Sequence, residues 1–158
     1  MAGMKGGCQY REIRLGNGVV FKGLANKKDP LTGDGELHLT NGSIYRGQIL
    51  KGQPHGQGEM VWSHEASDQL NSKRMDEDDK EIVTNEQNIG FQKSYKGNWV
   101  QGKMEGLGKY SLSEGEFYYG YFSNNIPNGH GIRKFANGDL YDGKYADGYQ
   151  TGQGMFIC

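Results

Sequence analysis

Five copies of one glycine pattern recur along the 158-residue chain and constrain its fold more than any other feature. Each copy begins with an aromatic residue, any residue and a glycine, and successive copies start 24, 50, 23 and 23 residues apart. A Gly-x-Gly pair follows 11 and 13 residues after the aromatic in the last four copies, and one residue later in the first. Such self-similarity predicts a repeat architecture. The starting triplets are Phe21-Lys22-Gly23, Tyr45-Arg46-Gly47, Tyr95-Lys96-Gly97, Tyr118-Tyr119-Gly120 and Tyr141-Asp142-Gly143.

The composition favours a thin, ordered β-sheet over a thick core or a disordered chain. The sequence holds 27 glycines but only 3 prolines, and 11% of its residues are aromatic, which fits neither collagen nor a flexible linker. Only 34% of the residues are hydrophobic, which is little for a two-layer core. A formal net charge of -1 provides no overall attraction to nucleic acid or to an anionic membrane, so no nucleic-acid partner is predicted.

Each repeat is predicted to form a two-stranded hairpin. The dipeptides Asn41-Gly42 and Asn137-Gly138 favour positive φ and mark reversals between units. A glycine or asparagine seven residues after the starting aromatic marks the other reversal in the last four units. Residues 10–15 share the phase of a closing strand and are predicted to end a truncated leading unit. The predicted fold is all-β, an elongated single-layer twisted antiparallel sheet of consecutive hairpins.

The period of two along a strand places most large rings on one face of this sheet. Glycines share that face, because a residue without a side chain leaves room for a ring of a neighbouring strand to lie over the backbone. The opposite face is predicted to be mainly polar, as at Lys96, Asn98, Asp142 and Lys144. A lone sheet has no second layer to cover its rings, so we expect a partner along this aromatic groove. The predicted partner-binding rings are Tyr45, Trp62, Tyr95, Trp99, Tyr110, Tyr118, Phe122, Phe135, Tyr141, Tyr145 and Phe156.

The segment from Tyr95 to Tyr110 reads YKGNWVQGKMEGLGKY, and this pattern resembles the MORN (membrane occupation and recognition nexus) repeat. The resemblance covers roughly residues 8–62 and 95–158. It implies consecutive MORN-type β-hairpins. It also implies a structural role, because MORN proteins serve in cilia and flagella, in parasite cytoskeletons and at membrane junctions.

The spacing of the repeats predicts four segments along the chain. Residues 1–9 form an N-terminal tail, and residues 10–62 hold the leading strand and repeats 1 and 2. Residues 63–94 form an acidic insertion, interpreted as a solvated loop or as a partner-docking element. Residues 95–158 hold repeats 3 to 5. No signal sequence or membrane-spanning stretch is recognisable, which favours a cytoplasmic protein.

The sequence shows no recognisable motif for catalysis, for a metal ion or for a cofactor. The chain is therefore predicted not to be an enzyme and to bind neither a metal ion nor a cofactor. The four histidines, His38, His55, His64 and His130, have no ligand partners at a suitable sequence spacing and are given structural or solvent-facing roles. The Gly-x-Gly pairs lack the following helix that a nucleotide loop requires. Two cysteines at opposite ends indicate a reduced intracellular setting.

Three functional hypotheses follow from the repeat. The first is a non-catalytic scaffold or adaptor of a large intracellular assembly, cytoskeletal or ciliary, that binds protein partners or a second copy through its rings and its terminal strand, 154–158. The second is peripheral binding of acidic phospholipids, weakly supported because the net charge is negative. The third is an accessory module for a separate catalytic partner. The lysines that would serve the second are Lys27, Lys28, Lys51 and Lys103.

Overall fold

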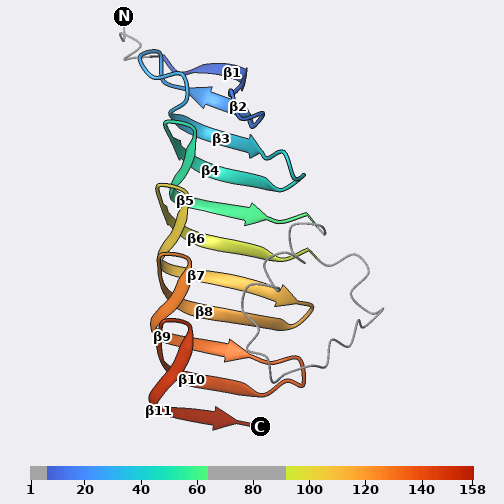
Figure 1. Ribbon diagram of the computed structural model, residues 1–158, viewed down its shortest axis with the longest axis vertical. Coiled ribbons are helices and arrows are strands. Elements are labelled where there is room, and N and C mark those ends of the chain that lie inside the picture. The colour runs from blue at the N-terminus through green and yellow to red at the C-terminus, as the bar shows by residue number, and fades with distance from the viewer. Residues whose placement is uncertain (1–6, 64–91) are drawn as a thin grey trace, which may run out of the picture.

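The computed structural model describes residues 7–63 and 92–158, which form one open antiparallel sheet of eleven strands in chain order (Figure 1). The sheet is elongated, and the described chain ends lie at its opposite extremes (Figure 1). No helix is present in these two ranges. The strands are β1 (Gln9–Arg14), β2 (Val20–Ala25), β3 (Gly33–His38), β4 (Ile44–Leu50), β5 (Gln53–Val61), β6 (Ser94–Val100), β7 (Lys103–Ser113), β8 (Glu116–Ser123), β9 (Ile126–Lys134), β10 (Leu140–Ala146) and β11 (Tyr149–Ile157).

The five repeats correspond to five hairpins, β2–β3 to β10–β11, so the predicted fold class is confirmed. Strand β1 precedes them and pairs with β2 in the register Ile13↔Phe21, as a leading strand should. Strand β5 pairs with β6 over six residues, from Gly56↔Trp99 to Val61↔Ser94. The sheet therefore continues across the acidic insertion, most of which lies outside the described residues.

Two kinds of turn alternate along the sheet. At one long side, which we call the asparagine end, the side chains of Asn41 and Asn137 accept hydrogen bonds from the backbone two residues on, at 3.0 and 3.1 Å. At the other side, the tip end, the hairpins reverse through paired residues of positive φ, such as Lys51 and Gly52. Two successive positive φ values are typical of type I′ turns, whose twist suits a hairpin.

The tips of neighbouring hairpins are tied together by backbone hydrogen bonds. In each case an amide at the reversal of one hairpin donates to a carbonyl near the start of the closing strand in the hairpin before it. These bonds, 2.8 to 3.1 Å long, hold the tips in a row and do not depend on side-chain chemistry. The pairs are Gly52 to Leu31, Gly102 to Pro54, Asn125 to Met104, and Gly148 to Pro127.

Much of the core is a single zigzag of rings on one face of the sheet, which we call the ring face, and Phe21, Leu37 and Met60 extend this core. Neighbouring rings meet edge to face, with centroids 4.9 to 5.7 Å apart, the geometry that aromatic pairs prefer. The zigzag crosses from hairpin to hairpin, so each unit buries its rings against the next one. In order along the sheet it contains Tyr45, Trp99, Tyr95, Phe122, Tyr118, Tyr145 and Tyr141.

Candidate binding surface

In the last four repeats, the starting tyrosine lies over one glycine on each strand of its own hairpin. A Cβ atom built on Gly108 of β7 would overlap the hydroxyl and ring carbons of Tyr95 on β6. The same overlap occurs between Tyr118 and Gly131, and between Tyr141 and Gly154. The prediction that the glycines make room for a ring from a neighbouring strand is confirmed.

The tyrosine hydroxyls also bind the backbone at a defined point. Tyr95 Oη donates to the carbonyl of Asn98 at 3.1 Å, and Tyr118 Oη to the carbonyl of Tyr121 at 3.1 Å. Each of these carbonyls lies where the hairpin register shifts, for example between Gly97 and Trp99. A shift of this kind leaves one residue outside the ladder, so the hydroxyl supplies the partner that the sheet does not.

Burial of these hydroxyls makes the fold sensitive to alkaline pH. Desolvation raises the pKa of Tyr45 and of Tyr95 to about 12, against about 10 in an unfolded chain. Below pH 10 both states are protonated and stability is unaffected. Between pH 10 and pH 12 the unfolded chain loses the protons first, so we expect the urea midpoint to fall steadily across this window. Tyr95→Phe should make that fall shallower, and an unchanged slope in the variant would contradict this assignment.

The structure buries most of the rings that were predicted to bind a partner, and it does so within the chain. Seven of the eleven are at most 5% exposed, so the expectation that a lone sheet cannot cover its own rings is wrong for them. Rings of adjacent hairpins cover each other, and the tips add Met104 and Ile49, both also buried. These seven are Tyr45, Tyr95, Trp99, Tyr118, Phe122, Tyr141 and Tyr145.

The other four predicted rings lie near the asparagine end of the ring face. Trp62, Tyr110 and Phe135 pack against the core but remain partly exposed, and Phe156 of β11 is 58% exposed. They meet in pairs, Trp62 with Tyr110 at 5.5 Å and Phe135 with Phe156 at 6.2 Å. The guanidinium of Arg133 lies 4.8 Å from the Phe135 ring centroid. We call Trp62, Tyr110, Phe135 and Phe156 the ring strip, because these rings keep accessible surface.

Comparison with known families agrees with this architecture. The MORN repeat model matches residues 45–63, 95–117, 118–140 and 141–158, which together make up more than half of the chain. The chain belongs to the MORN repeat family. The hairpin β2–β3 and the strand β1 lie outside the matched residues, although their register continues that of the MORN hairpins.

Among curated proteins the chain is similar to Alsin. It is 27% identical over 120 residues to Alsin of Mus musculus and, to the same extent, to Alsin of Homo sapiens. The alignment covers 72% of this chain but only 7% of each Alsin chain, so this chain spans a small part of the relatives that it matches. The MORN repeats and the partial similarity to Alsin indicate that this chain is a repeat-based binding module.

On the face opposite the rings, the MORN sheet carries apolar residues that the sequence analysis missed. Leu107, Tyr119 and Tyr121 are 43%, 44% and 51% exposed, where a mainly polar face was expected. Tyr119 and Tyr121 occupy positions one and three residues after the starting Tyr118. The corresponding positions of the next unit hold Asp142 and Lys144. Comparing the units with one another at each position, and not only the pattern that they share, would have identified Tyr119 and Tyr121 as exceptions.

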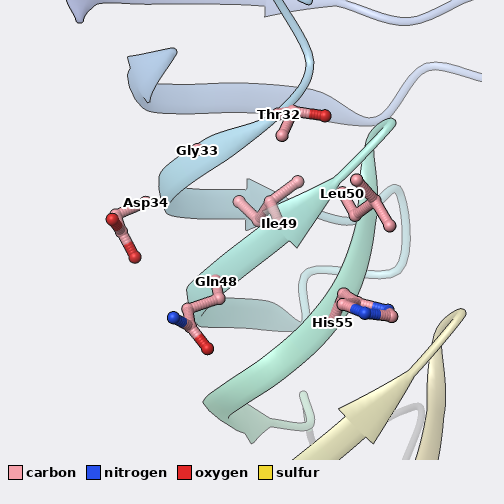
Figure 2. Close-up of a pocket in the computed structure, with 7 residues that line it drawn as sticks. All are labelled: Thr32, Gly33, Asp34, Gln48, Ile49, Leu50 and His55. Atoms are coloured by element: carbon pink, nitrogen blue, oxygen red, sulfur yellow. The ribbon is translucent and has the colours of Figure 1, made fainter. Parts of the chain in front are cut away.

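One pocket of about 280 Å³ opens beside the tip of the β4–β5 hairpin (Figure 2). Two of its polar side chains already hold backbone amides of the fold. The Gln48 side chain accepts a hydrogen bond from the Gln57 amide at 2.8 Å, and Thr32 Oγ1 accepts one from the Lys51 amide at 2.9 Å. The pocket is therefore a hollow between tips. Its lining residues are Thr32, Gly33, Asp34, Gln48, Ile49, Leu50 and His55.

The histidines of the described ranges have local partners. His38 Nε2 lies 2.8 Å from Glu36, and His130 Nε2 lies 2.6 Å from Asp142. His55 Nδ1 accepts a long hydrogen bond from the Gln101 amide at 3.5 Å. Within residues 7–63 and 92–158, no three histidine, cysteine or acidic side chains converge on one point. His64 lies outside these ranges. In the same part of the chain no helix has the length and apolar character needed to cross a membrane.

Proposed function

We propose that this MORN protein is a non-catalytic scaffold that binds a protein partner along the ring strip. The observation that carries the proposal is the partial exposure of Trp62, Tyr110 and Phe135 beside the seven buried rings of the zigzag on the same face. Aromatic side chains provide large contact area with few rotatable bonds, and they dominate protein interfaces. A row of them on a rigid sheet is preorganised for binding.

The last strand offers a second contact at the end of the same strip. All residues of β11 are exposed, including Tyr149, Met155 and Phe156 at 57 to 66%. Residues 149–158 hold no charged side chain. Edge strands of natural proteins usually carry charges that prevent pairing, so an uncharged edge favours the addition of a strand from a partner or from a second copy.

We place this scaffold in a large intracellular assembly, cytoskeletal or ciliary, because proteins built of MORN repeats serve in such structures. A catalytic partner would make the chain an accessory module, and in that case the activity would reside in the partner.

Photo-cross-linking in native cells tests the proposal. With p-benzoylphenylalanine in place of Trp62 or Tyr110, we expect the full chain to form an adduct with one defined polypeptide, identified by mass spectrometry. The matched control carries the same group at Gln53, an exposed residue of a hairpin tip. Adducts no more frequent at the strip than at Gln53 would refute the ring strip as the binding surface. An adduct with the chain itself would identify the partner as a second copy.

Binding of acidic phospholipids is a second candidate, supported by lysines at the tip end. Lys51 lies in the turn of the β4–β5 hairpin, and Lys103 begins β7 directly after the next turn. The two turns that follow hold Asn124 and Asp147. Only one stretch of the tip end is therefore basic. Flotation with vesicles of increasing phosphatidylserine content separates the two candidates, because only a lipid-binding surface responds to the anionic lipid.

A further inference from the structure

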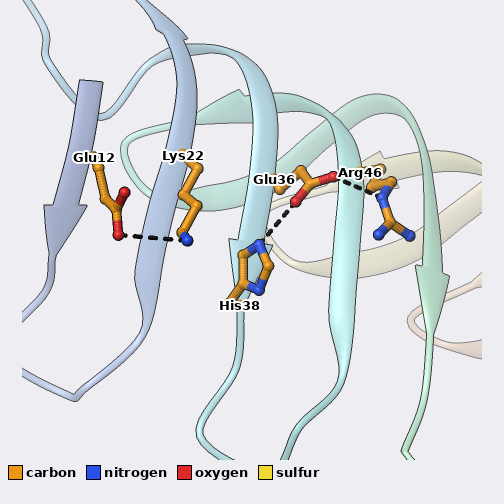
Figure 3. A network of polar contacts seen from close by, with 5 residues as sticks. All are labelled: Glu12, Lys22, Glu36, His38 and Arg46. Atoms are coloured by element: carbon orange, nitrogen blue, oxygen red, sulfur yellow. Dashed lines mark hydrogen bonds and ion pairs between the residues drawn. The ribbon is translucent and has the colours of Figure 1, made fainter. Parts of the chain in front are cut away.

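The opposite face carries a cross-strand row of charges that alternate in sign over the first five strands. In successive strand registers the row runs from Glu12 through Lys22, Glu36 and Arg46 to Glu59. Glu12 pairs with Lys22 at 3.4 Å, and Glu36 pairs with Arg46 at 2.7 Å (Figure 3). Hydrogen bonds from Arg46 and His38 lower the pKa of Glu36. Opposite charges on neighbouring strands stabilise a sheet, so the charges in this half of the row are compensated within the chain.

The row changes character at β6 and β7. Lys96 and Lys109 are direct cross-strand partners, which places two like charges side by side. The row then continues through Tyr119 of β8 and Ile132 of β9. On its other side Lys96 faces Glu59 of β5, so Lys96 still follows the alternation and Lys109 breaks it. Like charges directly opposite each other destabilise a sheet, and no carboxylate faces Lys109 in the ladder, where its partners are Lys96 and Tyr119.

Beside the two lysines lies a group of apolar side chains, which we call the tyrosine patch and define as Leu107, Phe117, Tyr119, Tyr121 and Ile132. Leu107 is the cross-strand partner of Tyr121, and Tyr119 lies between Lys109 and Ile132. The ammonium group of Lys109 is 4.5 Å from the ring centroid of Phe117. An apolar centre with a polar edge is the usual anatomy of a protein interface.

The edge of the patch is basic. Four lysines on strands β6 to β10 point to this face, and none of them forms an ion pair among the described residues. They are Lys96, Lys109, Lys134 and Lys144. The nearby carboxylate of Asp142 is already paired with His130 at 2.6 Å. Glu59 of β5 is the cross-strand partner of Lys96, so the excess of positive charge on this half of the face comes from Lys109, Lys134 and Lys144. It lies beside exposed tyrosines.

We propose that the tyrosine patch is a docking site for an acidic protein segment that carries apolar side chains. The apolar residues of the segment pack on Tyr119, Tyr121 and Leu107, and its carboxylates pair with Lys96 and Lys109. The site lies on the face opposite the ring strip and does not depend on it.

The distribution of charge favours a narrow partner over a bilayer. Together with its lysine edge, from β6 to β10, the patch spans four interstrand spacings, about 19 Å, which suits a short peptide segment. A flat anionic surface laid on the whole face would also meet Glu36, Glu12 and Glu59 of the same row. A segment confined to the patch and its lysine edge avoids Glu12 and Glu36 and meets Glu59 only at its margin, beside Lys96.

Selection from a displayed library of random 16-residue peptides, with the full chain as bait, tests the chemistry of the site. Counter-selection uses the double variant K96E/K109E. We expect the enriched peptides to carry Asp or Glu flanking aromatic or aliphatic residues. Enrichment of neutral or basic peptides, or of none, would overturn the proposal.

An enriched peptide, labelled with fluorescein, then gives affinities by anisotropy. We expect K96E/K109E to weaken binding at least tenfold, and Y119A/Y121A to do the same. K27E/K28E reverses the same amount of charge in the β2–β3 loop and should change affinity less than twofold. Equal losses in the two lysine variants would mean that only the overall charge matters and would overturn the site.

Two controls separate the remaining outcomes. Tyr119 and Tyr121 are exposed, so their alanine variant should keep the circular dichroism spectrum and the urea midpoint of the parent. The second control measures binding of the protein to vesicles with 30% phosphatidylserine. Vesicle binding that K96E/K109E abolishes, without selection of acidic peptides, would replace the protein segment with a membrane. Cross-linking from the ring strip tests the other face of the sheet. Its outcome therefore decides the proposed scaffold function independently of the peptide-binding results for the tyrosine patch.

Discussion

Replacing Trp99 with alanine is expected to lower the free energy of unfolding by about 4 kcal/mol, the largest effect that we expect from a single substitution. Trp99 is 3% exposed and meets both Tyr45 and Tyr95 edge to face, at 5.5 and 5.1 Å. Its indole nitrogen also donates to the carbonyl of Gly58 at 3.1 Å. The variant therefore leaves a cavity and removes a hydrogen bond at the junction between β5 and β6. Urea denaturation followed by circular dichroism measures the loss.

Trp62→Ala is the matched control, because Trp62 belongs to the ring strip and is only partly buried. It should cost about half as much, since less apolar area leaves contact with the protein. In an array each unit is stabilised by its neighbours, so Trp99→Ala should also separate the unfolding of the two halves into distinct transitions. A Trp62 variant as unstable as the Trp99 variant would contradict the zigzag as the core.

Gly108→Ala is expected to destabilise the protein by about 3 kcal/mol, because the added methyl group and the Tyr95 ring need the same space. The ring has no free side to move to, since Trp99 and Phe122 touch it at 5.1 and 5.0 Å. Moving the ring would also break the hydrogen bond to the Asn98 carbonyl. The urea midpoint again provides the measurement.

The control for this prediction is Gly16→Ala. A Cβ at Gly16 would have no atom within 4 Å, and the residue does not have a positive φ. Its alanine variant should therefore stay within about 0.5 kcal/mol of the parent. If both alanine variants lost the same stability, the effect would come from glycine in general and not from the overlap with Tyr95.

The sequence was sufficient for the parts of the fold that repeat. Hairpin boundaries, the turn residues Asn41-Gly42 and the stacking of Tyr95 over Gly108 all follow from a local pattern of glycines and rings. Burial of the rings was not predictable in the same way. It depends on the distance between hairpins and on how Trp99 of one unit turns toward Tyr45 of the unit before, which no single repeat encodes.

The candidate site was predictable only in part, for the same reason. Trp62, Tyr110, Phe135 and Phe156 were on the predicted face, but the pattern did not distinguish them from the buried rings. The tyrosine patch was missed because it deviates from the repeat: one unit alone places Tyr119 and Tyr121 where its neighbours have charged or amide side chains. In a repeat protein, structure is encoded by what the units share, and individual surfaces by where one unit differs.

The hydrogen bond from the Gly102 amide to the Pro54 carbonyl links the tips of two hairpins that the acidic insertion separates in sequence. This bond and the β5–β6 ladder join the first five strands of the sheet to the last six. Neither contact involves the covalent connection between these two halves, which leaves the sheet at the asparagine end, between Trp62 and Lys93. Mechanical force along the sheet would therefore pass through the ladder and the tips and not through the connecting segment.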